Sequence, residues 1–161
     1  APFGIMIHGD TVYVTYAKQD AARHDDVKGP HLGFVSAFGL DGTFLRRVAS
    51  RGKLDAPWGL ALAPADFGQA SGRLLVGNFG DGHIVSFRLA GEGDDDGGNG
   101  NGAYLTGPGG RLHVDGLWAL AFGNGAVAGP TNVLFFTAGP AGETHGLFGR
   151  IDLAPHPGDR D

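Results

Sequence analysis

The chain has 161 residues, of which 42% are hydrophobic, enough to bury a core within a single domain. Its formal net charge is −5, and its 12 basic residues form no sustained stripe, so we expect no nucleic-acid partner. No apolar run approaches the ~20 residues that a membrane-spanning helix needs. Cysteine is absent, which excludes disulfides and thiolate metal sites.

Three segments of the sequence each place a short apolar run around one aromatic residue. These residues, Phe3, Trp58 and Trp118, recur at intervals of 55 and 60 residues. Each is followed by two strand-like runs. These are Thr11–Ala17 and Gly33–Phe38 after Phe3, Leu74–Phe79 and His83–Arg88 after Trp58, and Val133–Ala138 and Leu147–Leu153 after Trp118. Repeats of this length with several strands each are typical of β-propellers, in which one repeat forms one four-stranded blade.

Fourth strands are expected in the first two repeats, at Thr43–Ala49 after an Asp41-Gly42 hairpin turn and at Ala103–Thr106. The third repeat ends at Leu153 without a clear fourth strand. The glycine-rich, acidic segment Gly91–Gly102 predicts a solvated loop inside the second blade.

The predicted fold class is therefore all-β, a β-propeller of three four-stranded blades that makes up about half of a six-bladed ring. The expected domain covers residues 1–153, with blades at about 1–54, 55–114 and 115–153 and a polar tail at 154–161. Propellers close with about four to eight blades, so three blades leave two apolar faces that must be covered. The expected partners are a missing propeller half, a second copy, or neighbours in a homo-oligomer or fibre.

Several motifs resemble those of known repeat families. The run Leu75–Gly82, followed by Ile84–Phe87, resembles NHL-type propeller repeats. Val14–Asp20, Ala56–Pro64 and Gly146–Gly149 are similar to an exported bacterial propeller family of no established activity, some members of which carry a PEP-CTERM sorting signal. The resemblance implies an extracellular or cell-surface bacterial protein that is longer than this chain.

One loop of the first repeat offers candidate metal ligands. The insertion Ala17–His31 contains His24, Asp25 and Asp26, whose imidazole and carboxylate groups are suited to calcium or another divalent cation. The simpler interpretation is that an Asp caps a turn by accepting backbone N–H bonds while the other two are solvated. Both interpretations remain open at this point.

A second candidate group belongs to the enzyme hypothesis for a six-bladed propeller, in which lactonases and related hydrolases hold calcium at the channel mouth. Asp55, Asn78, Asp81 and Asp115 are expected at or near that mouth. In those enzymes a polar ligand often precedes the glycine of the inner strand, whereas this chain has Phe3, Trp58 and Trp118 there, which provide no hard oxygen ligand. The recurrence of Asp55 and Asp115 three residues before an aromatic favours a structural role for both.

The sequence names no reaction, since it contains no nucleophile elbow, phosphate loop or zinc-protease motif, and no catalytic residue is assigned. We expect an exported, non-catalytic β-propeller scaffold or binding module that completes its ring or assembles through exposed blade edges. The alternative is a metal-dependent hydrolase or lyase of the six-bladed propeller type, with its site at the channel mouth.

Overall fold

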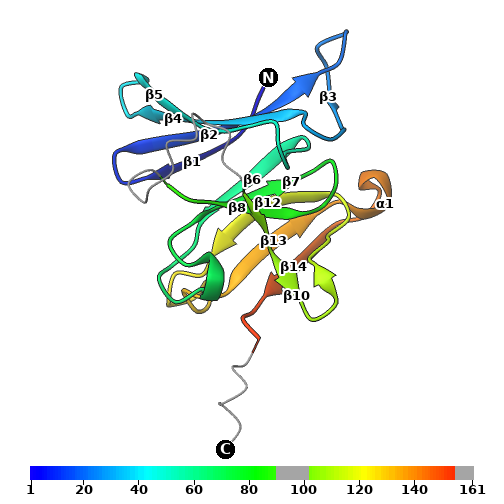
Figure 1. The fold of residues 1–161 in the computed structure, drawn as a ribbon. Helices are drawn as coiled ribbons and strands as arrows, with labels where there is room; N and C mark the ends of the chain where they lie inside the picture. Colours follow the sequence, from blue (N-terminus) through cyan, green and yellow to red (C-terminus); the bar gives the residue numbers. More distant parts are fainter. Residues whose placement is uncertain (90–101, 155–161) are drawn as a thin grey trace, which may run out of the picture.

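The computed structural model describes residues 1–89 and 102–154 and is all-β, with several antiparallel sheets (Figure 1). The first sheet contains β1 (Pro2–His8), β2 (Thr11–Gln19), β4 (Gly33–Gly39) and β5 (Phe44–Ser50), in that order, and β3 (Asp26–Val27) pairs with β2. The second sheet contains β6 (Pro57–Leu62), β7 (Leu74–Asn78), β8 (Ile84–Phe87) and β9 (Ala103–Tyr104). The third contains β12 (Leu117–Phe122), β13 (Leu134–Ala138) and β14 (Leu147–Ile151).

The remaining elements are short. The strands β10 (Thr106–Gly107) and β11 (Gly110–Arg111) form a two-stranded hairpin, a 3-10 turn covers Gly68–Ala70, and α1 spans Pro140–Glu143. No helix among the described residues is long and apolar enough to cross a membrane. The predicted loop at Gly91–Gly102 lies almost entirely outside the described residues, as does the tail beyond residue 154.

The three large sheets have the predicted strands in the predicted order. β2, β7 and β13 each pair with the strand before and after them, and the third sheet has three strands within the described part of the chain. We call the first strand of each sheet, β1, β6 and β12, its inner strand. The three inner strands share one irregularity, because the pairing register shifts between Pro2 and Ile5, between Pro57 and Leu60, and between Leu117 and Leu120. The repeat found in the sequence is therefore also present in the structure, although the described sheets do not close into a ring.

The second sheet is buried on both faces because the other two sheets pack against it (Figure 1). Adjacent residues of a strand point to opposite faces. Accordingly, Leu74 and Val76 join the core shared with the first sheet, whereas Leu75 joins the core shared with the third. All five residues of β7 are buried, which explains why this strand is a continuous apolar run with no alternation.

Two connections in the first sheet, a turn and a longer insertion, differ in how they form. The Asp41-Gly42 turn forms as predicted, with Gly42 at φ +83° and the Asp41 carboxylate accepting a hydrogen bond from the Thr43 N–H at 2.9 Å. The insertion at Ala17–His31, by contrast, is not simply a long loop. β2 continues to Gln19 and the chain returns as β3, pairing Lys18 with Val27 and Gln19 with Asp26.

Candidate functional site

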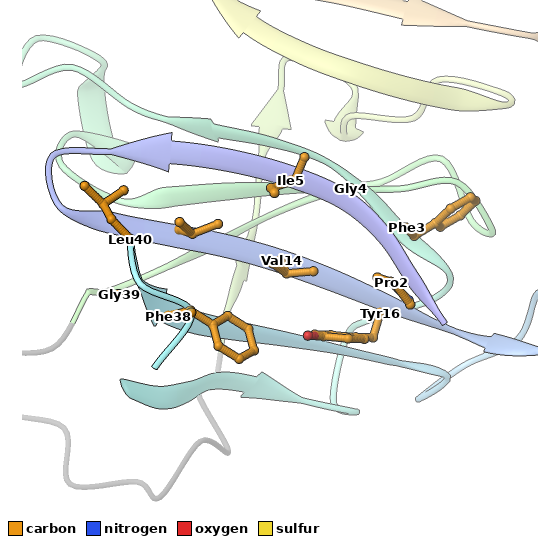
Figure 2. Close-up of a pocket in the computed structure, with 11 residues that line it drawn as sticks. Pro2, Phe3, Gly4, Ile5, Val14, Tyr16, Phe38, Gly39 and Leu40 are labelled. Carbon is orange, nitrogen blue, oxygen red and sulfur yellow. The ribbon is translucent and has the colours of Figure 1, made fainter. Parts of the chain in front are cut away.

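The outer face of the first sheet is apolar, and no other sheet among the described residues covers it. Val14, Tyr16 and Phe38 come from neighbouring strands and, together with Pro2 and Leu40, line a groove on this face (Figure 2). The side chains of Ile5 and Ile7 are 71% and 63% exposed. We call this surface, made of Ile5, Ile7, Val12, Val14, Tyr16 and Phe38, the leading face.

The repeat shows that the leading face is built like an internal interface. In the strand pairing, Ile5 lies opposite Val14, Leu60 opposite Val76 and Leu120 opposite Phe136, so these three inner-strand positions are equivalent. Leu60 and Leu120 are each 7% exposed because the preceding sheet covers them. The isoleucine at the same position has no preceding sheet among the described residues.

The outer face of the third sheet is the second surface that no other sheet of residues 1–89 and 102–154 covers. We call its residues Ala119, Ala121, Phe135, Thr137 and Phe148 the trailing face. Phe148 is 70% exposed and stacks on Phe135 with ring centroids 5.7 Å apart. Ala121 is equivalent to Met6 and Ala61, which pack into the two cores, but it is itself exposed. Each end of the stack thus presents a sheet face with exposed apolar side chains, and the trailing face also carries Arg150, which pairs with Phe135.

An aromatic cluster joins the three inner strands near their first residues. The ring of Phe3 stacks on Trp58 at 4.5 Å, and Trp58 lies 6.5 Å from Trp118 between ring centroids. Phe79 contacts both Phe3 and Trp58 edge-on, and the Lys28 ammonium lies 3.7 Å from the centre of the Phe79 ring. Lys28 carries no sequence motif that would have assigned it to this cluster.

The predicted metal ligands of the first repeat do not converge on one centre. The backbone N–H of His24 donates to the Asp20 carboxylate at 2.8 Å, and Asp25 accepts from the Asp26 N–H at 2.9 Å. Burial raises the pKa of the Asp26 carboxyl, and the negative charge of the neighbouring Asp25 raises it further. In residues 1–89 and 102–154, no three His, Asp or Glu side chains are grouped so that they could hold a metal ion.

The predicted channel-mouth residues hold loop backbone in place. Asp55 is buried and accepts from the Gly29 N–H of the first sheet's loop at 2.7 Å. Asp81 accepts from the N–H of His83 at 3.1 Å, and Asp115 accepts from the N–H of Ala141 at 2.9 Å.

Asn78 is the fourth predicted channel-mouth residue, and it is fully buried. Its side-chain Nδ2 donates to the Lys53 carbonyl at 2.8 Å. The structure thus places Asp55 and Asp81 close enough to interact electrostatically, whereas Asp115 belongs to the third sheet's own loop.

Burial raises the pKa of the Asp55 carboxyl above its ordinary value of 3.8; the hydrogen bond from Gly29 opposes the rise and the Asp81 charge adds to it. Because the folded state binds this proton more tightly than the unfolded state, the unfolding free energy falls as the pH rises from 3.8 through the folded-state pKa. Asp55→Asn keeps an acceptor for Gly29 but has no proton to lose. The variant should therefore gain stability relative to the parent as the pH rises.

Urea unfolding of both proteins between about pH 4 and pH 7 measures this difference. Asp26, whose pKa is also raised, contributes a slope of the same sign to both proteins and cancels in the comparison. Identical pH dependence in the two proteins would show that Asp55 does not titrate differently on folding.

Two curated relatives are uncharacterised proteins of Acanthamoeba polyphaga mimivirus. The first is 38% identical over 151 residues, which covers 93% of this chain and 35% of the relative. The second is 40% identical over 121 residues, covering 74% of this chain and 30% of the relative. The chain thus spans about a third of the length of these relatives. No family model and no solved structure matches it.

The resemblance to NHL-type repeats and to an exported bacterial family is therefore wrong, since the relatives found are viral proteins and no family model supports an NHL repeat. The misleading motif has a physical origin. In Pro57-Trp58-Gly59, a Cβ on the glycine would lie 2.7 Å from the carbonyl oxygen of Trp118. Close packing of β6 against β12 requires a glycine at this point, so packing alone accounts for the motif.

Proposed function

We propose that the chain is a non-catalytic assembly module whose three sheets are blades of a β-propeller and whose leading face receives another sheet of the same repeat. One observation carries the proposal. Ile5 is 71% exposed, whereas Leu60 and Leu120, at the equivalent position of the other two inner strands, are 7% exposed.

The proposal is supported by the chemistry of both ends of the stack. An apolar face of several adjacent side chains is unfavourable in water, and covering it releases roughly 25 cal/mol per Å² of apolar surface. Three blades are fewer than the roughly four to eight that close a propeller. The relatives are about three times as long as the matched segment, so they have room for further sheets of this kind.

The polar residues favour assembly over the hydrolase alternative. The carboxylates of Asp55, Asp81 and Asp115 each accept a backbone N–H of a loop, which is how a structural aspartate is used. A calcium-dependent active site and an extracellular location remain predictions of the sequence, and no contact described above favours either.

Ile5→Asp is expected to abolish self-association of the purified chain. Sedimentation velocity should show concentration-dependent association of the parent protein, because each copy has sheets of the repeat that could cover the leading face of another copy. A carboxylate on the leading face would be buried without a partner in the complex, which costs several kcal/mol, so association should weaken by roughly a hundredfold or more.

Val127→Asp is the matched control, because Val127 is fully exposed outside both faces and the substitution adds the same charge. This variant should associate like the parent. A parent chain that stays monomeric at every concentration tested, or an Ile5→Asp variant that associates normally, would overturn the proposed function.

A further inference from the structure

The two interfaces between the described sheets share one directional contact. A Cβ on Gly4 would lie 2.0 Å from the Trp58 carbonyl oxygen, and a Cβ on Gly59 would lie 2.7 Å from the Trp118 carbonyl oxygen. β1 and β6 therefore each use a glycine to admit the carbonyl of the aromatic residue in the following inner strand. The glycine always belongs to the earlier sheet and the carbonyl to the later one.

A hydroxyl group reinforces this contact between the first two sheets. Thr15 Oγ1 accepts from the Gly4 N–H at 2.8 Å and lies 3.3 Å from the Trp58 carbonyl oxygen, to which it can donate. Its other acceptor within reach, the Gly4 carbonyl oxygen, is at 3.4 Å. Thr15, in β2, thus links β1 of its own sheet to β6 of the following sheet.

The trailing face repeats this arrangement, with no following sheet in the described part of the chain. Thr137 occupies in β13 the position that Thr15 occupies in β2, and its Oγ1 accepts from the Ala119 N–H at 3.3 Å. Ala119 is exposed and equivalent to Gly4 and Gly59. The Thr137 hydroxyl is therefore placed to meet the carbonyl of a further inner strand.

The leading face supplies the complementary group. Phe3 is equivalent to Trp58 and Trp118, whose carbonyls each contact the preceding sheet. The carbonyl of Phe3 is accordingly the group that a preceding sheet would contact, and the apolar side chains of Ile5 and Val14 lie beside it on the same face. The two ends of one chain are thus complementary to each other.

We propose that the occupant of the leading face is a second copy of this chain, bound through its trailing face, with the Thr137 hydroxyl of one copy donating to the Phe3 carbonyl of the other. The inference rests on the proposed function and extends the two internal interfaces to a third of the same kind. Two such contacts, related by a twofold axis, join two copies into one ring. Its six sheets lie within the roughly four to eight that close a propeller.

Ala119 makes this contact looser than the internal ones. Its Cβ stands where Gly4 and Gly59 have none, so the two copies must sit slightly farther apart at that point. Ala119→Gly should therefore tighten the association of two copies. Ala121→Gly is the control, because Ala121 corresponds to Met6 and Ala61, where the repeat requires no glycine.

Mixing two variants distinguishes head-to-tail binding from pairing of two leading faces. Ile5→Asp blocks the leading face, and Phe148→Asp blocks the trailing face at a side chain that is 70% exposed. Each variant alone should sediment as a monomer, whereas an equimolar mixture should form a one-to-one heterodimer through the single intact contact. A Phe148→Asp variant that associates alone, combined with a mixture that forms no heterodimer, would overturn the head-to-tail arrangement.

The hydroxyl contact is tested in the same heterodimer. Adding Thr137→Val to the Ile5→Asp chain, which supplies the trailing face, should weaken the heterodimer by about threefold to tenfold. Thr137→Ser should restore the affinity. Equal affinity with Val and Thr would refute the hydroxyl contact. A parent protein that never associates refutes the proposed function itself, so the two failures are distinguishable.

Discussion

Replacing Gly4 by alanine is expected to lower the free energy of unfolding by about 1–3 kcal/mol, the usual cost of overpacking a tight contact. The added Cβ would lie 2.0 Å from the Trp58 carbonyl oxygen and 3.0 Å from Thr15 Oγ1. Neither atom is the end of a flexible side chain. β1 must therefore move away from β6, which also lengthens the hydrogen bond between Thr15 and the Trp58 carbonyl.

Urea unfolding of Gly4→Ala against Gly109→Ala measures this cost, since a Cβ on Gly109 would meet no atom within 4 Å. Near-ultraviolet circular dichroism adds a local measurement, because Phe3 stacks on Trp58 at 4.5 Å and this stack should loosen in Gly4→Ala. If both variants were equally stable and kept the parental aromatic signal, the close approach of the two inner strands would be refuted.

Much of the strand pattern could be predicted because each repeat combines a turn signal with apolar runs of strand length. β2, β7 and β13 lie within a residue or two of their predicted bounds, and the Asp41-Gly42 turn forms where it was expected. The short strand β3 was missed, because Asp26–Val27 becomes a strand only through pairing with the extended end of β2.

The exposure of the outer faces could not be taken from residue types alone. Ile5 and Leu60 are chemically alike and occupy equivalent positions, yet one is exposed and the other buried, because the difference lies in which sheets are neighbours. Contacts between loops were equally hidden. Lys28 over Phe79 and Asp55 on Gly29 join segments far apart in the sequence, and no local pattern marks them.

The charged residues are hard to interpret from the sequence for a related reason. An Asp before a turn satisfies loop N–H groups in any fold, so a run such as His24-Asp25-Asp26 carries little information about metals. In the structure, Asp25 accepts from its own neighbour and His24 uses its backbone on Asp20. A ligand set is recognised by convergence of side chains in space, which a single sequence does not show.

Leu74→Ala and Leu75→Ala are expected to destabilise the protein by about 2–5 kcal/mol each, because both side chains are fully buried and each leaves a cavity. The two residues are neighbours in β7 but face opposite cores, Leu74 toward the first sheet and Leu75 toward the third. Leu40→Ala is the control, since Leu40 is 61% exposed and should cost far less.

These two variants also report whether the sheets unfold together. In a stack where each sheet contacts only its neighbours, a cavity at one interface can release one end while the other stays folded. Tryptophan fluorescence reports the inner strands through Trp58 and Trp118, and far-ultraviolet circular dichroism reports all strands. We expect the two signals to coincide in both variants, because the second sheet belongs to both cores and cannot lose one without weakening the other. Separate transitions in Leu74→Ala, with the first sheet unfolding at lower urea, would show instead that the second and third sheets form a unit that is stable without it.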